Sequence, residues 1–458
     1  MKKIFLILFI FTILISLPAF SKDTKKYNEN HIEYMNIQWW EKYKDDYLID
    51  NLLKLYKNNY DLKNAELKVK ENEQIVKIQF ANELPKLNLS GELYRNLQSS
   101  MQQYGDMQIP SYAQYNYYLP LTMSYEVDIW GTNRLKTKSI KQQLEIIKQL
   151  ERATYISLSS DFSADYFNLI KTDELINIQD EIIKLQEEIL SKTKDKYETG
   201  LCTINEVLSE EKILTKLNEE KNSYVKTRDV LINTMKVYLA NNEDNIDRNK
   251  YENLNILENI PTEYSTKVIE NRPDYKQEES NIKRLGFDVK IAKREFLPKF
   301  IIFGQIGLNA YHLNTLFNRQ SQLFNAGVLP SLDIFSGGRK KAFLRLKKLE
   351  YEEALNNYQK TILTGIKEVN TGLINYKEAS DNYKESIKRL ELQNKIYNLV
   401  KDKYEIGAAS NLDVLYAKEI YLAVRKEEVS NKINSLISTI SIYKAAGGID
   451  LYNLNEDI

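Results

Sequence analysis

Apolar and polar residues alternate along four stretches of the chain, at about 86–97, 115–130, 298–309 and 323–335. The second stretch is the clearest, because an apolar or aromatic residue occupies every second position from Tyr115 to Ile129. Polar residues fill most of the positions between them. A period of two, with one apolar and one polar face, is typical of β-strands. The pattern therefore predicts two pairs of strands.

The run from Tyr115 to Ile129 is long enough to cross a bilayer as a tilted strand, which needs roughly 9–11 residues. Tyrosines lie near both of its ends, as an interfacial aromatic belt requires. The residues predicted to face lipid are Tyr117, Leu119, Leu121, Met123 and Tyr125. Four strands cannot close a barrel, and an open edge cannot face hydrocarbon. Copies of the chain would therefore share one barrel; an ordinary soluble hairpin is the alternative.

Two very long helices follow the strand pairs. Neither 131–197 nor 336–404 contains a proline, and each would extend roughly 100 Å as a helix. Apolar residues with a spacing of seven predict a coiled-coil seam towards their ends. These are Ile176, Ile183, Leu190 and Tyr197, which align with Tyr383, Leu390, Tyr397 and Tyr404. Returning helices at about 203–240 and 410–446 would be the antiparallel partners.

Much of the chain is duplicated. Residues Lys194–Gly200 return as Lys401–Gly407 at an offset of 207, with only the sixth residue changed. Leu-Pro-Lys before each first strand repeats at an offset of 213, and the Asp-Ile-aromatic motif after each second strand repeats at 205. Such a small drift in offset indicates tandem duplication. The drop from 213 to 205 predicts a longer loop between the strands of the first copy.

The repeated heptapeptide predicts a tight reversal between two helices. Gly200 and Gly407 stand where a left-handed residue would end the first helix. Thr203-x-x-Glu206 and Ser410-x-x-Asp413 then have the form of a capping box that begins the second. The reversals span 197–208 and 404–415.

The domain organisation follows from this duplication. Lys2-Lys3, the apolar run to Leu17 and small residues up to Ser21 predict an export signal, with a retained anchor as the alternative. No cysteine lies near the cleavage site, so lipid attachment is not supported there. The predicted parts are a signal peptide (1–21), a polar N-terminal arm tracking the surface or poorly ordered (22–44), repeat 1 (45–245), a linker (246–261), repeat 2 (262–448) and a C-terminal tail (449–458).

Composition excludes several classes of function. The chain has 458 residues, and 64 basic and 64 acidic side chains balance, which argues against nucleic-acid binding. Cys202 is the single cysteine, so no intramolecular disulfide can form. His31 and His312 have no Cys or His partner at metal-ligand spacing, and phosphate-binding and nucleophile motifs are absent from the sequence. We therefore expect no enzyme activity, no cofactor and no metal.

The whole pattern resembles the TolC-like outer-membrane efflux proteins, in their multidrug-efflux branch. The resemblance covers nearly the whole mature chain and rests on motifs that occur in a specific order. They are Trp39-Trp40, Arg272-Pro273-Asp274, Leu-Pro-Lys before each first strand, Asp128-Ile129-Trp130-Gly131, Asp333-Ile334-Phe335-Ser336-Gly337-Gly338-Arg339, Tyr404-x-x-Gly407-x-x-x-x-Leu412-Asp413-Val414-Leu415 and Tyr443-x-Ala445-x-Gly447-Gly448.

This resemblance implies a mainly α fold with a β-barrel: a homotrimer with a twelve-stranded barrel in outer-membrane lipid and a helical tunnel in the periplasm. It also implies two partners, a periplasmic adaptor and an inner-membrane transporter of RND or ABC type. By the resemblance, Tyr404 and Asp413 belong to a gate that opens when the second hairpin swings. The residues implied to dock the adaptor are Gly200, Leu201, Leu208, Gly407, Ala408 and Leu415.

Some of these roles have simpler alternatives. Asp413 is also the third residue of a capping box, which is reason enough for an acid there, and Glu206 is expected to be only a cap. Three copies of Asp413 around an axis would form an acidic ring that favours cations. Some family members carry a further acid one turn later, where this chain has Tyr416, and the family's usual lipid-bearing cysteine is absent.

The resulting hypothesis is a passive trimeric duct of a tripartite pump that exports small molecules or drugs. Two alternatives remain open at this point. One is the same kind of duct serving a type I protein secretion system. The other, from a different class, is a secreted coiled-coil scaffold without a pore, which the alternating stretch at 115–129 argues against.

Overall fold

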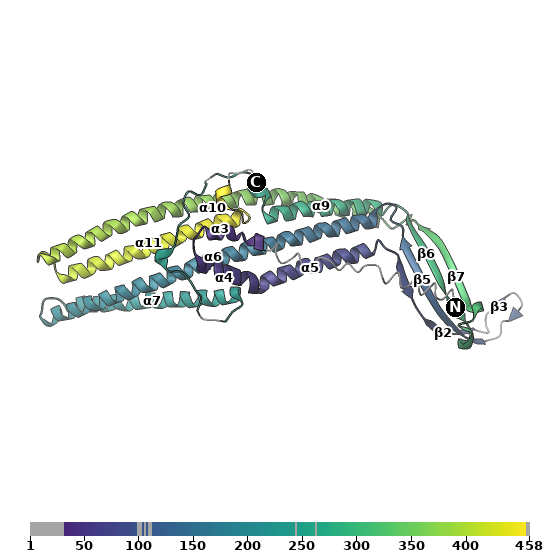
Figure 1. Cartoon of the computed structure of the whole chain (residues 1–458), viewed down its shortest axis with the longest axis horizontal. Helices are drawn as coiled ribbons and strands as arrows, with labels where there is room; N and C mark the ends of the chain where they lie inside the picture. The colour runs from purple at the N-terminus through teal and green to yellow at the C-terminus, as the bar shows by residue number, and fades with distance from the viewer. Residues whose placement is uncertain are drawn as a thin grey trace. The chain divides into compact units, whose positions relative to one another are not determined.

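The computed structural model describes residues 32–98, 103–104, 107–108, 112–242, 245–261 and 263–454. The predicted signal peptide and His31 lie outside these residues. The chain forms two compact units, and each draws on both sequence repeats. One unit comprises 1–65, 151–273 and 362–458, and the other comprises 66–150 and 274–361. The first contains both helical reversals and the second contains the strands, as the labels in Figure 1 show.

Each repeat has the same order of elements: helix, strands, long helix, returning helix. In repeat 1 these are α4 (Asp46–Asn58), α5 (Tyr60–Ala81), β1 (Lys86–Leu89), β2 (Glu92–Gln98), β3 (Gln103–Tyr104), β4 (Met107–Gln108), β5 (Tyr112–Glu126), α6 (Thr132–Glu198) and α7 (Ile204–Leu239). In repeat 2 they are α8 (Lys267–Glu270), α9 (Pro273–Arg294), β6 (Lys299–Ala310), β7 (Gln322–Ser331), α10 (Arg339–Glu405) and α11 (Asn411–Ala445).

The two long helices have the predicted length, since α6 and α10 each contain 67 residues. The helical stretch before the first strand, in contrast, is interrupted at Asn59. Its side-chain oxygen accepts from the backbone N–H of Asp61 at 2.8 Å, so it caps α5, and its amide donates to the Tyr238 carbonyl at 2.9 Å. A residue that caps one helix competes with the continuation of the preceding one. Among the described residues, no helix combines the length and the apolar composition that a membrane span requires.

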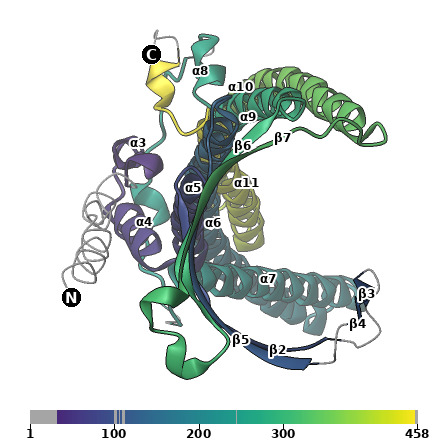
Figure 2. The same cartoon turned by 90° about the vertical axis from the view of Figure 1, so that its right-hand side faces the viewer.

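Five strands form one antiparallel sheet in the order β1-β5-β6-β7, with β2 also paired to β5. Figure 2 labels β2, β5, β6 and β7 of this sheet, and β3 and β4 form a separate two-stranded sheet. The predicted first strand is split in two. The Ser90 N–H donates to the Pro120 carbonyl at 3.1 Å, but proline has no N–H to donate in return, so the ladder is interrupted between Leu89 and Glu92. On the other side of Pro120 stands Gly307, whose added Cβ would lie 2.6 Å from the Leu119 carbonyl oxygen.

The second strand of each pair ends earlier than predicted, at Glu126 and Ser331 rather than near 130 and 335. In the first copy the reason is the aspartate that follows. The Asp128 carboxylate accepts from the backbone N–H groups of Asn133 and Arg134, each at 3.0 Å, and so caps the start of α6. In the sequence, the alternation of apolar and polar residues continues through this connection. In the structure, the backbone of the connection already forms the cap of the helix.

The described part of the N-terminal arm does not track the surface. Trp39 and Trp40, in α3 (Ile37–Glu41), are fully buried, which contradicts the expectation of a surface-tracking or poorly ordered segment. Trp39 stacks on Tyr443 with ring centroids 5.6 Å apart, and the hydroxyls of Tyr43 and Thr439 lie 2.6 Å apart. The arm is therefore part of the core, and α11, near the other end of the chain, covers it.

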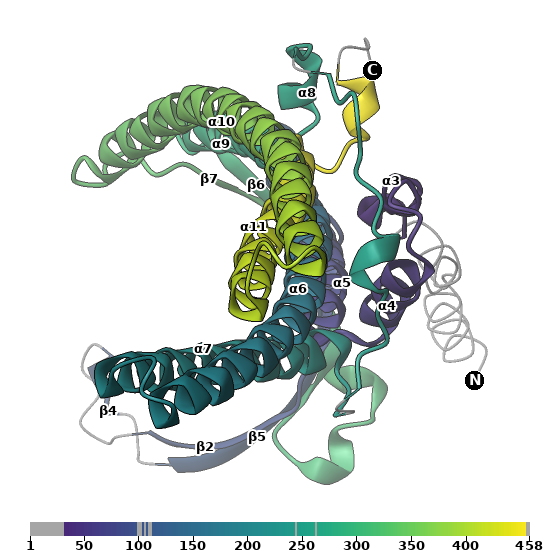
Figure 3. The same cartoon turned by 90° about the vertical axis from the view of Figure 1, so that its left-hand side faces the viewer.

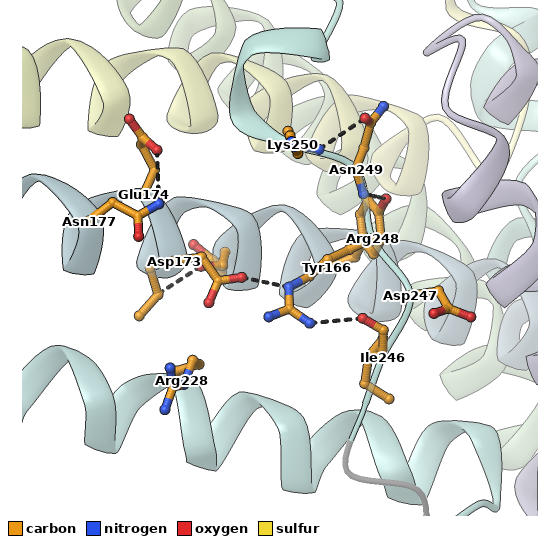
Figure 4. A network of polar contacts seen from close by, with 12 residues as sticks. Tyr166, Asp173, Glu174, Asn177, Arg228, Ile246, Asp247, Arg248, Asn249 and Lys250 are labelled. Carbon is orange, nitrogen blue, oxygen red and sulfur yellow. Dashed lines mark hydrogen bonds and ion pairs between the residues drawn. The ribbon is translucent and has the colours of Figure 1, made fainter.

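The linker between the repeats is held against α6 by polar contacts (Figure 4). The Tyr166 hydroxyl donates to Asp45 and accepts from the backbone N–H of Asn249 at 3.0 Å. Arg248 pairs with Asp173 at 2.5 Å. Further along, the Tyr251 hydroxyl donates to Glu428 of α11 at 2.9 Å. The linker is therefore bound to both repeats.

Candidate functional site

The two helical reversals have the same backbone geometry, and the predicted role of their glycines is confirmed. Gly200 has φ +73° and Gly407 has φ +75°, a conformation that L side chains rarely adopt. After each glycine, the chain folds back on the preceding helix: the Leu201 N–H donates to the Lys196 carbonyl at 2.8 Å, and the Ala408 N–H to Lys403 at 2.7 Å. This double pattern ends both helices in the same way.

The predicted capping boxes are also present at both reversals. The Asp413 carboxylate accepts from the backbone N–H and the hydroxyl of Ser410, each at 2.7 Å, while the Asp413 N–H donates back to the Ser410 hydroxyl at 3.2 Å. The Glu206 carboxylate accepts from the Thr203 N–H at 3.0 Å. These hydrogen bonds hold the pKa of both carboxyls below their ordinary values.

The proposed gate and docking residues differ in exposure. Tyr404 and Asp413 are both exposed, as are Gly200, Gly407 and Ala408. Leu201 and Leu208 are 77% and 54% exposed. Leu415 is not available in this way: its side chain is only 7% exposed. In the single chain, neighbouring residues already cover the Leu415 side chain, so it offers a docking partner little surface.

An open groove of about 410 Å³ lies between the two reversals. Its lining is mainly polar, with three carboxylates and one ammonium group, and comprises Thr193, Lys196, Asn205, Glu206, Ser209, Glu210, Ser410, Leu412, Asp413 and Tyr416. The groove therefore brings the two predicted tips together in one unit of the protein.

Tyr416 links the two hairpins at this groove. Its hydroxyl donates to Glu210 of α7 at 2.7 Å, and the Gln186 side-chain amide donates to the same carboxylate at 2.6 Å. Burial and the Glu210 charge raise the pKa of Tyr416, so it stays a neutral donor. Sequence reasoning noted Tyr416 only as the position where an acid was missing. Nothing in the sequence around Tyr416 indicates that its partner is Glu210, about 200 residues away.

Two further ionic contacts join α11 to the first hairpin, which consists of α6 and α7; Figure 3 labels these three helices. Arg425 pairs with Glu174 of α6 at 2.7 Å. Lys426 donates to Gln179 at 2.6 Å and lies 3.6 Å from Glu220 of α7. Glu174 is 8% exposed in its side chain, and burial raises its pKa despite the neighbouring arginine. These contacts, with Tyr416–Glu210, tie the second hairpin to the first along α11.

The register of the sheet gathers the predicted lipid-facing residues on one face. Across from them on β6 stand residues that are also apolar or small: Tyr117 opposite Ala310, Leu119 opposite Leu308, Leu121 opposite Ile306, Met123 opposite Gly304 and Tyr125 opposite Ile302. Residues directly opposite in a ladder share a face. The next strands continue it, since Leu89 stands opposite Leu121, and Val328 opposite Ile302.

Large side chains on this face are exposed to an unusual degree. Leu89 is 65%, Phe324 79% and Val328 60% exposed. On the opposite face Thr122 stands between Asn88 and Gln305, and Ser124 between Lys86 and Phe303. An apolar sheet face of this extent left open in a single chain marks an interaction with membrane or protein.

In the described residues, no three His, Cys, Asp or Glu side chains gather to hold a metal ion.

Comparisons with known proteins agree with this geometry. A family model described as outer membrane efflux protein matches residues 51–219 and 265–448. These ranges cover most of the chain and include both strand pairs and both reversals. The chain belongs to the outer membrane efflux protein family. It is an efflux channel of the outer membrane with a helical domain in the periplasm, and members of this family are trimeric channels that work with an adaptor and an inner-membrane pump.

Individual relatives of this efflux channel are distant but match over nearly their whole length. The solvent efflux pump outer membrane protein SrpC of Pseudomonas putida is 23% identical over 420 residues, which cover 89% of this chain and 86% of the relative. The cation efflux system protein CusC of Escherichia coli O157:H7 is 22% identical and covers 91% of this chain and 89% of its own.

The fold of this chain is similar to the folds of solved channels, although the sequences are only distantly related. The crystal structure of the Campylobacter jejuni CmeC outer membrane channel superposes with a TM-score of 0.83 at 25% identity, covering 90% of this chain and 88% of that one. The predicted fold class, long helical hairpins with strands that contribute to a shared barrel, is confirmed by these matches.

Proposed function

We propose that this channel is the passive trimeric duct of a tripartite pump that exports small molecules or drugs across the periplasm and outer membrane. Its partners would be a periplasmic adaptor and an inner-membrane transporter of RND or ABC type. The observation that carries this proposal is the strand register, because it places a continuous apolar face on a sheet of the width that a shared barrel requires. With β1 and β2 counted as one interrupted strand, three such sheets would supply twelve strands.

Within that proposal the five odd-numbered residues of β5 from Tyr117 to Tyr125 face lipid, and Thr122 and Ser124 face the water-filled interior. Small barrels in membranes alternate in this way along each strand. The sheet ends at β7 on one side and at β1 and β2 on the other. Edges of this kind are excluded from hydrocarbon unless they are paired, so the barrel must be closed by other copies.

The gate would lie at the reversals and open when the second hairpin moves away from the first. Tyr416–Glu210, Arg425–Glu174 and Lys426–Glu220 would restrain that movement, since each joins α11 to the first hairpin. Asp413 would serve both as the cap of α11 and, in three copies, as an acidic ring that favours cations. Tyr404 would lie beside it as part of the constriction.

The adaptor would dock on the exposed residues of both reversals. Leu201 and Leu208 offer apolar side chains, and the small residues at Gly200, Gly407 and Ala408 allow close approach of another backbone. The exported substrate would be selected mainly by the pump. In support of this, relatives of the same fold are named for solvents in one case and for cations in another. A type I protein secretion duct is the alternative.

The gate is tested by measuring single-channel conductance of the purified trimer in planar bilayers. Tyr416→Phe keeps the ring but removes the hydroxyl that donates to Glu210, so we expect a higher open probability than in the wild type. Tyr421→Phe is the matched control on the same helix, because the stack of Tyr421 on Tyr397, with centroids 6.1 Å apart, needs only the ring.

Three results would distinguish the proposed function from its alternatives. Unchanged currents in Tyr416→Phe would remove this contact from the gate. A processed protein that stays monomeric and dissolved in water without detergent would contradict the duct and favour the scaffold. Restored drug efflux in cells that carry a cognate adaptor and pump, without restored protein secretion, would favour the tripartite pump over the secretion duct.

A further inference from the structure

A pocket of about 300 Å³ lies where α5 and α6 meet the sheet. Helices, strands and the turn after α5 contribute to its lining, which includes Gln79, Leu84, Lys86, Glu126, Lys136 and Ile301. All six residues lie in the unit that contains the strands, so the pocket belongs to one compact part of the chain. Its volume is at the lower end of the range for pockets that bind small molecules.

The strand register places this pocket on the polar face of the sheet. Lys86 stands opposite Ser124, and Glu126 stands opposite Ile301. Residues directly opposite in a ladder, and residues two apart on one strand, share a face. Ser124 belongs to the face that points into the water-filled interior of the proposed duct. A molecule that passes from the helical tunnel into the barrel therefore moves past this pocket.

The pocket has two cationic side chains and one anionic side chain. The Lys136 ammonium donates to the Asn133 amide oxygen at 3.4 Å, which is long for a hydrogen bond. In the described part of the chain, no ion pair includes Lys86, Lys136 or Glu126. The excess positive charge of the pocket is therefore not neutralised within the chain, and both lysines can bind an anion that enters from the interior of the duct.

Gln79 supplies a third hydrogen-bond donor to the pocket. Its side-chain nitrogen is buried and has no hydrogen-bond partner among the described residues. A buried donor left without an acceptor destabilises a protein, so groups of this kind normally have a partner. An acceptor placed in the pocket would complete the hydrogen bonding of Gln79. Because Lys86 and Lys136 line the same pocket, an anionic acceptor fits it best.

The rest of the pocket offers apolar surface. Leu84 is 50% exposed, and Ile301 also lines the pocket. Phe303 stands opposite Ser124 on the same face of the sheet. Its ring lies so close to Gly327 that a Cβ added there would be 2.9 Å from it. The pocket and its surroundings therefore combine cationic donors with apolar side chains, which matches a molecule that has an anionic group on an apolar body.

We propose that this pocket is a subsite for amphipathic organic anions on their way through the duct. The anionic group accepts hydrogen bonds from Lys86, Lys136 and Gln79, and the apolar body contacts Leu84 and Ile301. The inference rests on the proposed function and adds to it the class of molecule that the wall of the duct retains. Glu126 limits the affinity because its carboxylate repels the ligand. Weak binding suits a passage, because the ligand must leave again.

Block of the ionic current tests the subsite, with the purified trimer in planar bilayers. The probe is naphthalene-2-carboxylate, added on the barrel side, and 2-naphthylmethanol is the matched control with the same rings and no charge. We expect the carboxylate to halve the wild-type conductance at a concentration at least about tenfold below that of the alcohol, because only the carboxylate pairs with the two lysines.

Four variants locate the block. Lys136→Gln should raise the half-blocking concentration of the carboxylate at least about fivefold. Lys138→Gln is the control with the same change of charge on the same helix, because Lys138 is exposed and does not line the pocket. Glu126→Gln should lower the half-blocking concentration, a gain that a damaged pocket would not give. Gln79→Met keeps the size of the side chain and removes the donor, so it should weaken the block without lowering the thermal midpoint of the trimer.

The possible outcomes separate the subsite from the duct. Equal block by the carboxylate and the alcohol would overturn the recognition of an anion. Equal effects of Lys136→Gln and Lys138→Gln would overturn the subsite, because the carboxylate would then bind elsewhere. Conductance that the carboxylate does not change would also overturn the subsite while leaving the duct intact. Wild-type trimers that conduct no ions would instead contradict the proposed duct and, with it, the inference that rests on it.

Discussion

The two reversals of this channel have almost the same sequence and the same backbone, yet they do not present the same surface. Both end a helix at a left-handed glycine and begin the next with a capping box. Leu208, however, is 54% exposed, whereas its equivalent Leu415 is 7% exposed. Local interactions decide the turn, and the neighbours of each copy decide which side chains remain available to a partner.

The strands are where the two copies should be most alike, and substitutions there should have the largest effect. Met123→Arg and its repeat equivalent Val328→Arg each place a charge on the apolar face, at a cost of roughly 2–4 kcal/mol near the bilayer midplane. We expect both to reduce the trimer recovered in outer-membrane fractions. Ser124→Arg, on the opposite face, is the control and should be tolerated; equal recovery of all three would contradict the assignment of faces.

Substitution of the equivalent leucines in the two reversals should have different effects in the two copies. Leu415→Ala removes a buried side chain, so we expect a loss of about 2 kcal/mol in the free energy of unfolding, visible as a lower thermal midpoint in detergent. Leu208→Ala should leave that midpoint nearly unchanged and instead weaken capture of the adaptor in a binding assay. If the two variants were equally stable, the difference in burial between the copies would have no energetic meaning.

The glycines of the reversals should show the copies to be equal again. Alanine at Gly200 or Gly407 meets no atom within 4 Å, so the penalty comes only from the left-handed backbone, about 1–2 kcal/mol. We expect the same fall in thermal midpoint for both. Gly286→Ala is the opposite control, because this glycine lies inside α9 with an ordinary contact to Tyr351, and alanine there should stabilise the helix.

The capping acids should give the smallest change in stability and the clearest change in function. Native hydrogen bonds lower the pKa of Asp413 and Glu206, so their stabilisation is present at neutral pH and disappears as the pH falls through the pKa of each folded carboxyl. Asp413→Ala and Glu206→Ala should therefore lower stability slightly and equally at pH 7, and less at acidic pH.

Conductance should then distinguish the two acids. We expect Asp413→Ala to raise the leak or lower the cation preference in planar bilayers, and Glu206→Ala to leave both unchanged. Identical currents in the two variants would reduce Asp413 to a helix cap, as its position in the sequence alone allows.

The parts of the fold that were predictable from sequence are those that depend on neighbours along the chain. The left-handed turn at Gly407 and the cap at Asp413 involve residues within six positions of each other, and the strands carry their own period. The donation of Tyr416 to Glu210, in contrast, depends on another hairpin, about 200 residues away in sequence. No periodicity within either helix contains that information.

The burial of the N-terminal arm could not be predicted for the same reason, and here the contacting residues are even further apart in sequence. Trp39 and Trp40 interrupt a polar stretch without a clear period, and their burial depends on Tyr443, about 400 residues further on. The break of the first strand at Ser90 was equally invisible locally, because its cause is a proline on the opposite strand. In each case the deciding atom lies on a different segment.

The equal length of α6 and α10 has an evolutionary consequence. A single residue inserted into either helix would turn every side chain beyond it by about 100° around the helix axis and separate it from its partners. Both helices have 67 residues, and the unequal spacing of the two copies falls in the loops and short connections between elements. We expect homologues of this channel to vary in length where strands are joined, and to inherit the length of the helices unchanged from the ancestral gene that was duplicated.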